Sequence, residues 1–200
     1  KIYLLLVIVV SSLAGYSQSL DDISDMMVKK DFAAAKAAID KYLADEKNAS
    51  KPEAWYYKGR VYNSYSYEKS TPESELYNLK AAAFEAFKKN QVMDSKDVRM
   101  KIENYGSYLD LYYGFYDLGA NLFNNKKYSE AFDAFKKSLE VGDYILSKKY
   151  TYPQATLYAL DTALVLNTAI AATQAKKEDE SIAYYRKITD ANVSGEGYKE

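Results

Sequence analysis

The 200-residue sequence contains no cysteine and no histidine. These two absences exclude disulfide bonds, zinc sites of the usual Cys/His kind, haem ligation by histidine, and the Ser-His and Cys-His pairs of nucleophilic catalysis. Carboxylate-only chemistry, as in glycosidases, stays open, and so does a hard-cation site made of Asp and Glu. With 28 acidic residues in the chain, some carboxylates will lie close together by chance, so a carboxylate pair alone indicates little.

The chain also has almost no net charge. Its 27 basic and 28 acidic residues sum to −1 at pH 7, and no basic patch is interleaved with aromatic residues. No overall field therefore recruits nucleic acid or an anionic membrane surface. The scattered Lys and Glu residues are typical of solvated helix faces. We predict no nucleic-acid partner, no metal site and no cofactor.

Residues 1–17 are typical of an export signal rather than of a fold. Lys1 precedes an apolar run from Ile2 to Val10, which small and polar residues follow. This order is that of a secretory signal peptide, and the run is shorter than the roughly 20 apolar residues of a membrane span. A buried N-terminal helix is the alternative interpretation. Because no Cys follows the run, we predict an exported protein, periplasmic or extracellular, that is not lipid-anchored and not inserted in a membrane after signal cleavage.

Two stretches place a small residue between large ones on one helical stripe. In "AWYYKGRVYNSYSY" the spacing i, i+4, i+7 joins Trp55, Gly59 and Tyr62. In "FYDLGANLFNNKKYSEAFDAFKKSL" the same spacing recurs at Phe115, Gly119 and Leu122. A second stripe follows each, formed by Ala83, Phe87 and Asn90 and by Ala131, Phe135 and Ser138. The glycine makes a notch on the first helix, and we expect the backbone of the second helix to enter it beside the small residue.

These helix pairs resemble the tetratricopeptide repeat family, whose 34-residue unit has Trp, Leu-Gly and Tyr on one helix and Ala, Phe and Ala on the next. "WYYKGRVY" carries the Trp, Gly and Tyr, with Lys58 where Leu is usual, and "DLGANL" carries Leu118 and Gly119. "KKDFAAAKAAIDKYL" is similar to another second helix, after a first helix from Leu20 to Val28. "LVLNTAIAATQAKKEDESIAYYRKI" is similar to a fourth unit, with Ala169, Ala172, Ser181, Tyr185 and Ile188 on the stripes. The resemblance implies an all-α array of antiparallel helix hairpins, a superhelical solenoid.

The predicted repeat domain covers residues 18–200, with units near 18–49, 52–97, 112–145 and 162–193. Three inserts interrupt the regular spacing: "SYSYEKSTPESEL", "SKDVRMKIENYGSYLDL" and "LSKKYTYPQATLYAL". We expect these inserts to extend helices or to form loops, with Asp97 and Asp161 as N-caps. Helical arrays usually finish with a polar-faced capping helix, and the fourth unit is followed by none. We therefore expect that the sequence is truncated at its C-terminus or that its last hairpin frays.

The repeat register divides the aromatic residues into core and surface. The predicted repeat core consists of Trp55, Gly59, Tyr62, Gly119, Leu122, Ala131 and Phe135. In the family, positions 2, 5, 9, 12 and 13 of each first helix line the inner, concave wall. The resemblance implies three sets of wall residues here: Glu53, Tyr56, Arg60, Asn63 and Ser64; Tyr113, Tyr116, Ala120, Phe123 and Asn124; and Ala163, Leu166, Ile170, Thr173 and Gln174. Our candidate ligand-binding residues among them are Tyr56, Arg60, Asn63, Tyr113, Tyr116, Phe123 and Asn124.

The composition of this wall favours a peptide ligand. Tyr and Asn give contact area and adaptable hydrogen bonds, which suit an extended peptide or a loop. The wall does not have the Lys, Asn and Arg cluster with which some family members bind a C-terminal carboxylate. We therefore expect a non-enzymatic, exported scaffold that binds a protein or peptide on its concave face. The alternatives are a glycan-binding helical repeat protein of a bacterial cell envelope, a carboxylate-pair hydrolase, and a wall whose rings pack against the inserts instead of a ligand.

Overall fold

The computed structural model describes residues 19–94 and 96–194, and the side chains up to residue 191. The predicted signal peptide and the last six residues lie outside this described part. Within it the chain forms ten helices and no strand, apart from one isolated bridge between Tyr152 and Ala155. The helices are α1 (Leu20–Val28), α2 (Phe32–Leu43), α3 (Glu46–Ala49), α4 (Pro52–Tyr65), α5 (Glu73–Met93), α6 (Val98–Ile102), α7 (Gly106–Asn124), α8 (Tyr128–Ser147), α9 (Thr162–Gln174) and α10 (Glu178–Ser194).

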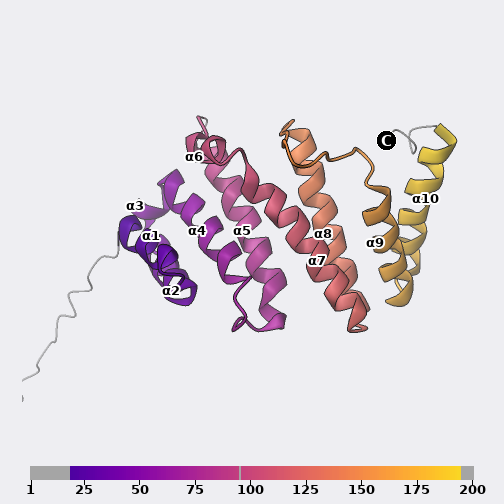
Figure 1. Ribbon diagram of the computed structural model, residues 1–200, viewed down its shortest axis with the longest axis horizontal. Helices are drawn as coiled ribbons and strands as arrows, with labels where there is room; N and C mark the ends of the chain where they lie inside the picture. The colour runs from indigo at the N-terminus through magenta and orange to yellow at the C-terminus, as the bar shows by residue number, and fades with distance from the viewer. Residues whose placement is uncertain (1–18, 95, 195–200) are drawn as a thin grey trace, which may run out of the picture.

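The long helices lie side by side as a row of hairpins that follows the order of the chain (Figure 1). The hairpins are α1 with α2, α4 with α5, α7 with α8, and α9 with α10. The second helix of each hairpin also packs on the first helix of the next one. The predicted all-α array of helix hairpins is therefore confirmed. None of the helices in the described ranges combines the length and the apolar character that crossing a bilayer requires.

Three of the hairpins turn in the same way. A lysine with a left-handed backbone follows the first helix in each, namely Lys30 (φ 59°), Lys126 (φ 61°) and Lys176 (φ 58°). The amide of the next residue donates to the carbonyl five residues earlier, and the N–O distance is 2.9 Å in all three turns. This is the Schellman arrangement, which satisfies carbonyls that the end of a helix leaves unpaired. The recurrence of one turn at three places is a structural repeat that the sequence pattern did not reveal.

Short acidic and hydroxyl side chains cap the starts of α1, α2, α3 and α9. Ser19 and Asp22 form a capping box at α1. Asp161 caps α9 as predicted, because its carboxylate accepts a hydrogen bond of 2.9 Å from the Leu164 amide. The prediction for Asp97 is wrong in part. This residue precedes α6 but has a left-handed backbone (φ 50°) and makes no side-chain cap bond; its carboxylate accepts instead from the Gln91 amide at 3.4 Å.

The notch glycines are filled by aromatic rings rather than by backbone. A Cβ atom added to Gly59 would lie 2.5 Å from the ring of Phe87, and one added to Gly119 would lie 2.6 Å from the ring of Phe135. Real Cβ atoms essentially never come this close to another atom. The expected notch is therefore present in both hairpins. The expectation that the backbone of the second helix enters it is wrong, because the Phe one turn beyond the small residue occupies the space.

The predicted repeat core is buried at every position except Trp55. Tyr62, Leu122, Ala131 and Phe135 are at most 9 % exposed, and Gly59 and Gly119 are buried. Trp55 is only half-buried: its indole nitrogen donates to the Ala49 carbonyl at 2.8 Å, and Lys89 Nζ lies 3.6 Å from the centre of its ring. Ala54, one residue earlier, occupies the fully buried position of α4. The fourth unit differs similarly, since Tyr185 is 39 % exposed while Tyr184 packs on Phe132 of α8.

The three inserts adopt different structures. The first becomes the loop 66–72 between α4 and α5. The second forms α6 and the opening turns of α7, which begins at Gly106. The third, 146–160, supplies the last two residues of α8 and then crosses without a further helix to the cap of α9. The second insert bears directly on the predicted wall of the second unit, because Glu103, which follows α6, forms an ion pair with Arg60 of α4.

Candidate functional site

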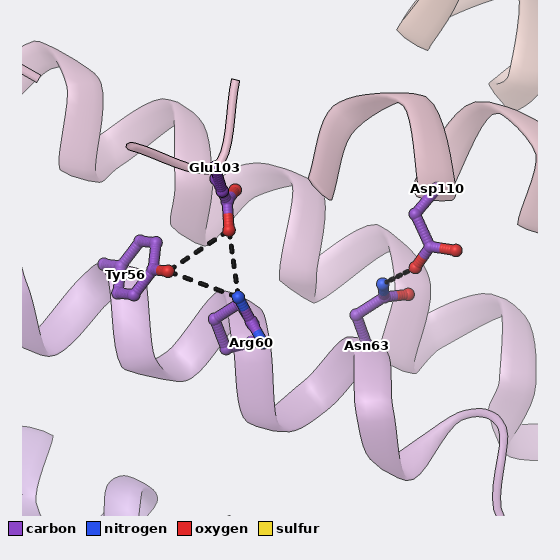
Figure 2. A network of polar contacts seen from close by, with 5 residues as sticks. All are labelled: Tyr56, Arg60, Asn63, Glu103 and Asp110. Carbon is purple, nitrogen blue, oxygen red and sulfur yellow. Dashed lines mark hydrogen bonds and ion pairs between the residues drawn. The ribbon is translucent and has the colours of Figure 1, made fainter. Parts of the chain in front are cut away.

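The first three candidate residues lie on one stripe of α4 and point at the second insert. Figure 2 shows Tyr56, Arg60 and Asn63 facing Glu103, which follows α6, and Asp110, near the start of α7. The guanidinium of Arg60 forms an ion pair of 2.9 Å with Glu103, and the Tyr56 hydroxyl donates to the same carboxylate oxygen at 3.2 Å. The amide of Asn63 donates to the carboxylate of Asp110. The insert thus supplies hydrogen-bond partners to all three candidates.

The charges and the burial in this network keep the Tyr56 hydroxyl protonated. Burial, and then the negative charge of Glu103, raise the pKa of Tyr56, so its hydroxyl stays protonated and donates. The Glu103 charge is cancelled by Arg60, and a second ion pair joins Arg99 of α6 to Glu53. The wall residues of the second unit therefore bind to the second insert of the same chain. For this unit the structure matches the alternative interpretation of the sequence, in which wall residues pack against an insert instead of a ligand.

The wall of the third and fourth units is open. A hollow of about 210 Å³ lies between α7 and α9, and its lining consists of Ala120, Phe123, Asn124, Phe135, Asn167 and Ile170. Four of these residues, Ala120, Phe123, Asn124 and Ile170, are wall positions that the repeat register predicted. The hollow is mainly apolar, with the amides of Asn124 and Asn167 as its polar groups. Its floor includes Phe135, the ring that fills the notch at Gly119.

The two remaining candidates extend this surface along α7. Tyr113 is 46 % exposed, and its neighbour on the next turn, Tyr116, is half-buried. The hydroxyl of Tyr116 accepts a hydrogen bond of 3.4 Å from the amide of Asn167. Sequence reasoning missed Asn167, although it lies between the predicted wall positions Leu166 and Ile170 on the same helix. We call the hollow together with Tyr113 and Tyr116 the α7–α9 groove.

A buried lysine lies close to the exposed face of α7. Lys80 of α5 is 3 % exposed, and its amine has no hydrogen-bond partner in the described part of the chain. The amine lies 3.5 Å from the centre of the Tyr67 ring, in space left free by Gly114, where an added Cβ would be 2.7 Å from Nζ. Burial lowers the pKa of Lys80 to about 8, against the opposing charges of Asp110 and Asp117. Sequence reasoning counted this lysine among the solvated ones.

A second hollow of about 320 Å³ lies on another side of α8, under the third insert. Its lining includes Leu139, Gly142 and Leu146 of α8, Leu157 of the insert, and Tyr184 of α10. The hydroxyl of Tyr112 donates to Asp161 at its edge. Within residues 19–94 and 96–194, no group of three or more acidic side chains is placed to hold a metal ion.

Comparison with known proteins adds no assignment. A scan against protein-family models, a search of curated proteins and a search of solved structures each found no match. The hairpin array is a finding of the structure, whereas the resemblance to the tetratricopeptide repeat family stays a prediction that rests on the residues quoted above.

Proposed function

We propose that this chain is a non-enzymatic, exported scaffold of the tetratricopeptide-repeat kind, which binds an extended peptide or a loop of a partner protein in the α7–α9 groove. The observation that carries the proposal is the hollow between α7 and α9, where four predicted wall residues meet. Export, to the periplasm or the extracellular space, is supported by the signal-like order of residues 1–17.

The groove offers the two kinds of contact that peptide recognition needs. The apolar part can take one aliphatic or aromatic side chain, and buried apolar anchors usually dominate the affinity of such complexes. The amides of Asn124 and Asn167 can pair with the backbone of the ligand, since an amide both donates and accepts. Asn124 is exposed and Asn167 is half-buried, so both border the solvent side of the hollow.

Binding can be tested with a library of fluorescent octapeptides, each with one fixed residue, and with a panel of oligosaccharides. We expect peptides with a fixed Leu, Ile or Phe to bind best. Ala120→Leu fills the hollow and should weaken this binding about tenfold or more, which corresponds to about 1.4 kcal/mol. Ala183→Leu is the matched control, because Ala183 is an exposed position of α10.

Two results would contradict the proposal. One is peptide binding that Ala120→Leu leaves unchanged, which would place the ligand elsewhere on the chain. The other is binding of an oligosaccharide but of no peptide, which would favour the glycan-binding alternative. Hydrolysis of an oligosaccharide in the same panel would favour the carboxylate-pair hydrolase.

A further inference from the structure

The two helices that flank the α7–α9 groove carry charge of one sign. Four lysines, Lys126, Lys127, Lys176 and Lys177, lie in the turns that follow these helices, at the end of the hollow away from Asp117. The charged residues of α7 are Asp110 and Asp117, and the helix has no lysine or arginine. Helix α9 carries no charged residue at all. The nearby Arg60 does not change this balance, because Glu103 pairs with it.

The two aspartates differ in their hydrogen bonds to other side chains of the chain. The carboxylate of Asp110 accepts from the Asn63 amide and, at 3.2 Å, from the Tyr67 hydroxyl. Asp117 is exposed, and in the described part of the chain no hydrogen bond or ion pair joins it to another side chain. The positive charge that acts on both is the buried amine of Lys80. One amine against two carboxylates leaves a net negative charge, and Asp117 is the carboxylate that faces solvent unpaired.

Asp117 also lies at a useful distance from the hollow. It precedes Ala120 by three residues and Phe123 by six, which is about 4.5 to 9 Å along the axis of α7 at 1.5 Å per residue. An extended peptide advances about 3.3 Å per residue and points alternate side chains to the same face. In a ligand that lies along α7, a side chain two residues from the apolar anchor therefore reaches the level of Asp117 and faces the same way.

We infer that the ligand of the α7–α9 groove is a basic–apolar segment, in which a Lys or Arg two residues from the apolar anchor pairs with Asp117. This inference rests on the proposed function and adds the chemistry of the partner to it. An exposed ion pair contributes little, so the basic residue should improve affinity about two- to fivefold. The preference should shrink as salt is added, because salt screens exposed charges.

The test uses three fluorescent octapeptides, acetylated and amidated at their ends, with one Leu in a Gly/Ser background. The residue two positions from the Leu is Lys, Gln or Glu. Wild-type protein should bind the Lys probe most tightly and the Glu probe most weakly. Asp117→Lys should reverse this order, and Asp133→Lys should not, because Asp133 is an exposed residue of α8. The second variant makes the same change in total charge.

The outcomes separate this inference from the proposed function. If all three probes bind alike, or if Asp117→Lys keeps the preference for Lys, the inference is overturned while the groove stands, provided that Ala120→Leu still blocks the probes. If no probe binds, or if Ala120→Leu binds them as the wild type does, the proposed function fails and the inference fails with it.

Discussion

The packing at Gly119 gives the sharpest test of the hairpin structure, through the substitution Gly119→Val. Gly119 lies in the middle of α7, where helix propensity alone favours almost any other residue. Replacing glycine by valine in an exposed helix should stabilise by a few tenths of a kcal/mol. The structure predicts the opposite sign, because an added Cβ would lie 2.6, 2.7 and 3.0 Å from three atoms of the Phe135 ring.

The size of the effect depends on how closely that ring is packed. Phe135 is 3 % exposed and also contacts the ring of Tyr116, with 5.8 Å between the ring centres. Forcing extra methyl groups into a well-packed core costs about 1–3 kcal/mol. Since the gain in propensity is small, the net loss in the free energy of unfolding should also be about 1–3 kcal/mol. Gly106→Val is the control on the same helix, because an added Cβ there meets nothing within 4 Å.

Urea denaturation followed by circular dichroism measures these differences. A double-mutant cycle with Phe135→Ala sharpens the test: once the ring is gone, Gly119→Val should no longer destabilise, because the valine occupies the vacated space. Neighbouring sites that compete for space should depart from additivity by more than the roughly 0.5 kcal/mol seen at independent sites. A stabilised single variant, or an additive cycle, would refute the assignment of Phe135 to the notch.

Two further predictions concern residues whose surroundings the structure revealed. Trp55→Ala should lower the free energy of unfolding by about 1–3 kcal/mol. This is less than the roughly 3–5 kcal/mol expected for a fully buried aromatic residue, because the Trp55 ring is half-buried. Urea denaturation measures the loss, and a loss above about 3 kcal/mol would mean that Trp55 belongs to the core. Because the pKa of Lys80 is lowered to about 8, the folded chain releases this proton at a lower pH than the unfolded chain does, so stability should rise with pH. Between pH 7 and pH 9 the free energy of unfolding of the wild type should increase by about 1 kcal/mol relative to that of Lys80→Met. The Lys80→Met variant is the reference because its tyrosines titrate as those of the wild type do. If the two proteins show parallel pH profiles, the amine of Lys80 is not buried.

Local periodicity was enough to predict the hairpins, but it did not predict which surfaces of the hairpins the inserts cover. The predicted helix from Leu20 to Val28 has the observed bounds, and the spacing around Gly59 and Gly119 indicated two notches that the structure contains. These features depend on residues a few positions apart. Trp55 was misplaced because the repeat pattern does not tell which of two neighbouring positions, Ala54 or Trp55, faces the core.

Long-range contacts explain the rest of what the sequence did not reveal. Arg60 and Glu103 are 43 residues apart, and no spacing rule connects them. The other two lysines of the helix that carries Lys80, Lys88 and Lys89, are half-buried and exposed, so nothing in the pattern sets Lys80 apart; the absence of a side chain at Gly114, on another helix, makes room for its amine. Four lining residues of the open hollow could be predicted because they follow from one repeat register. The contacts of α4 with the second insert could not, because they depend on the path of that insert.

Under the proposed function, the inserts therefore determine which part of the wall is open to a partner. The second insert covers the wall of α4 and satisfies Tyr56 and Arg60 with one carboxylate, so an external ligand there would have to replace an ion pair that the fold already provides. The third insert leaves the next wall free, because it contacts α7 at Tyr108 and Tyr112, which are not wall residues, and packs on α8 beside Leu139 and Gly142. An array of equal hairpins would offer one continuous surface. This chain offers a short one, about two helices wide, which favours a ligand held by one apolar anchor and its close neighbours over a long segment bound along every unit.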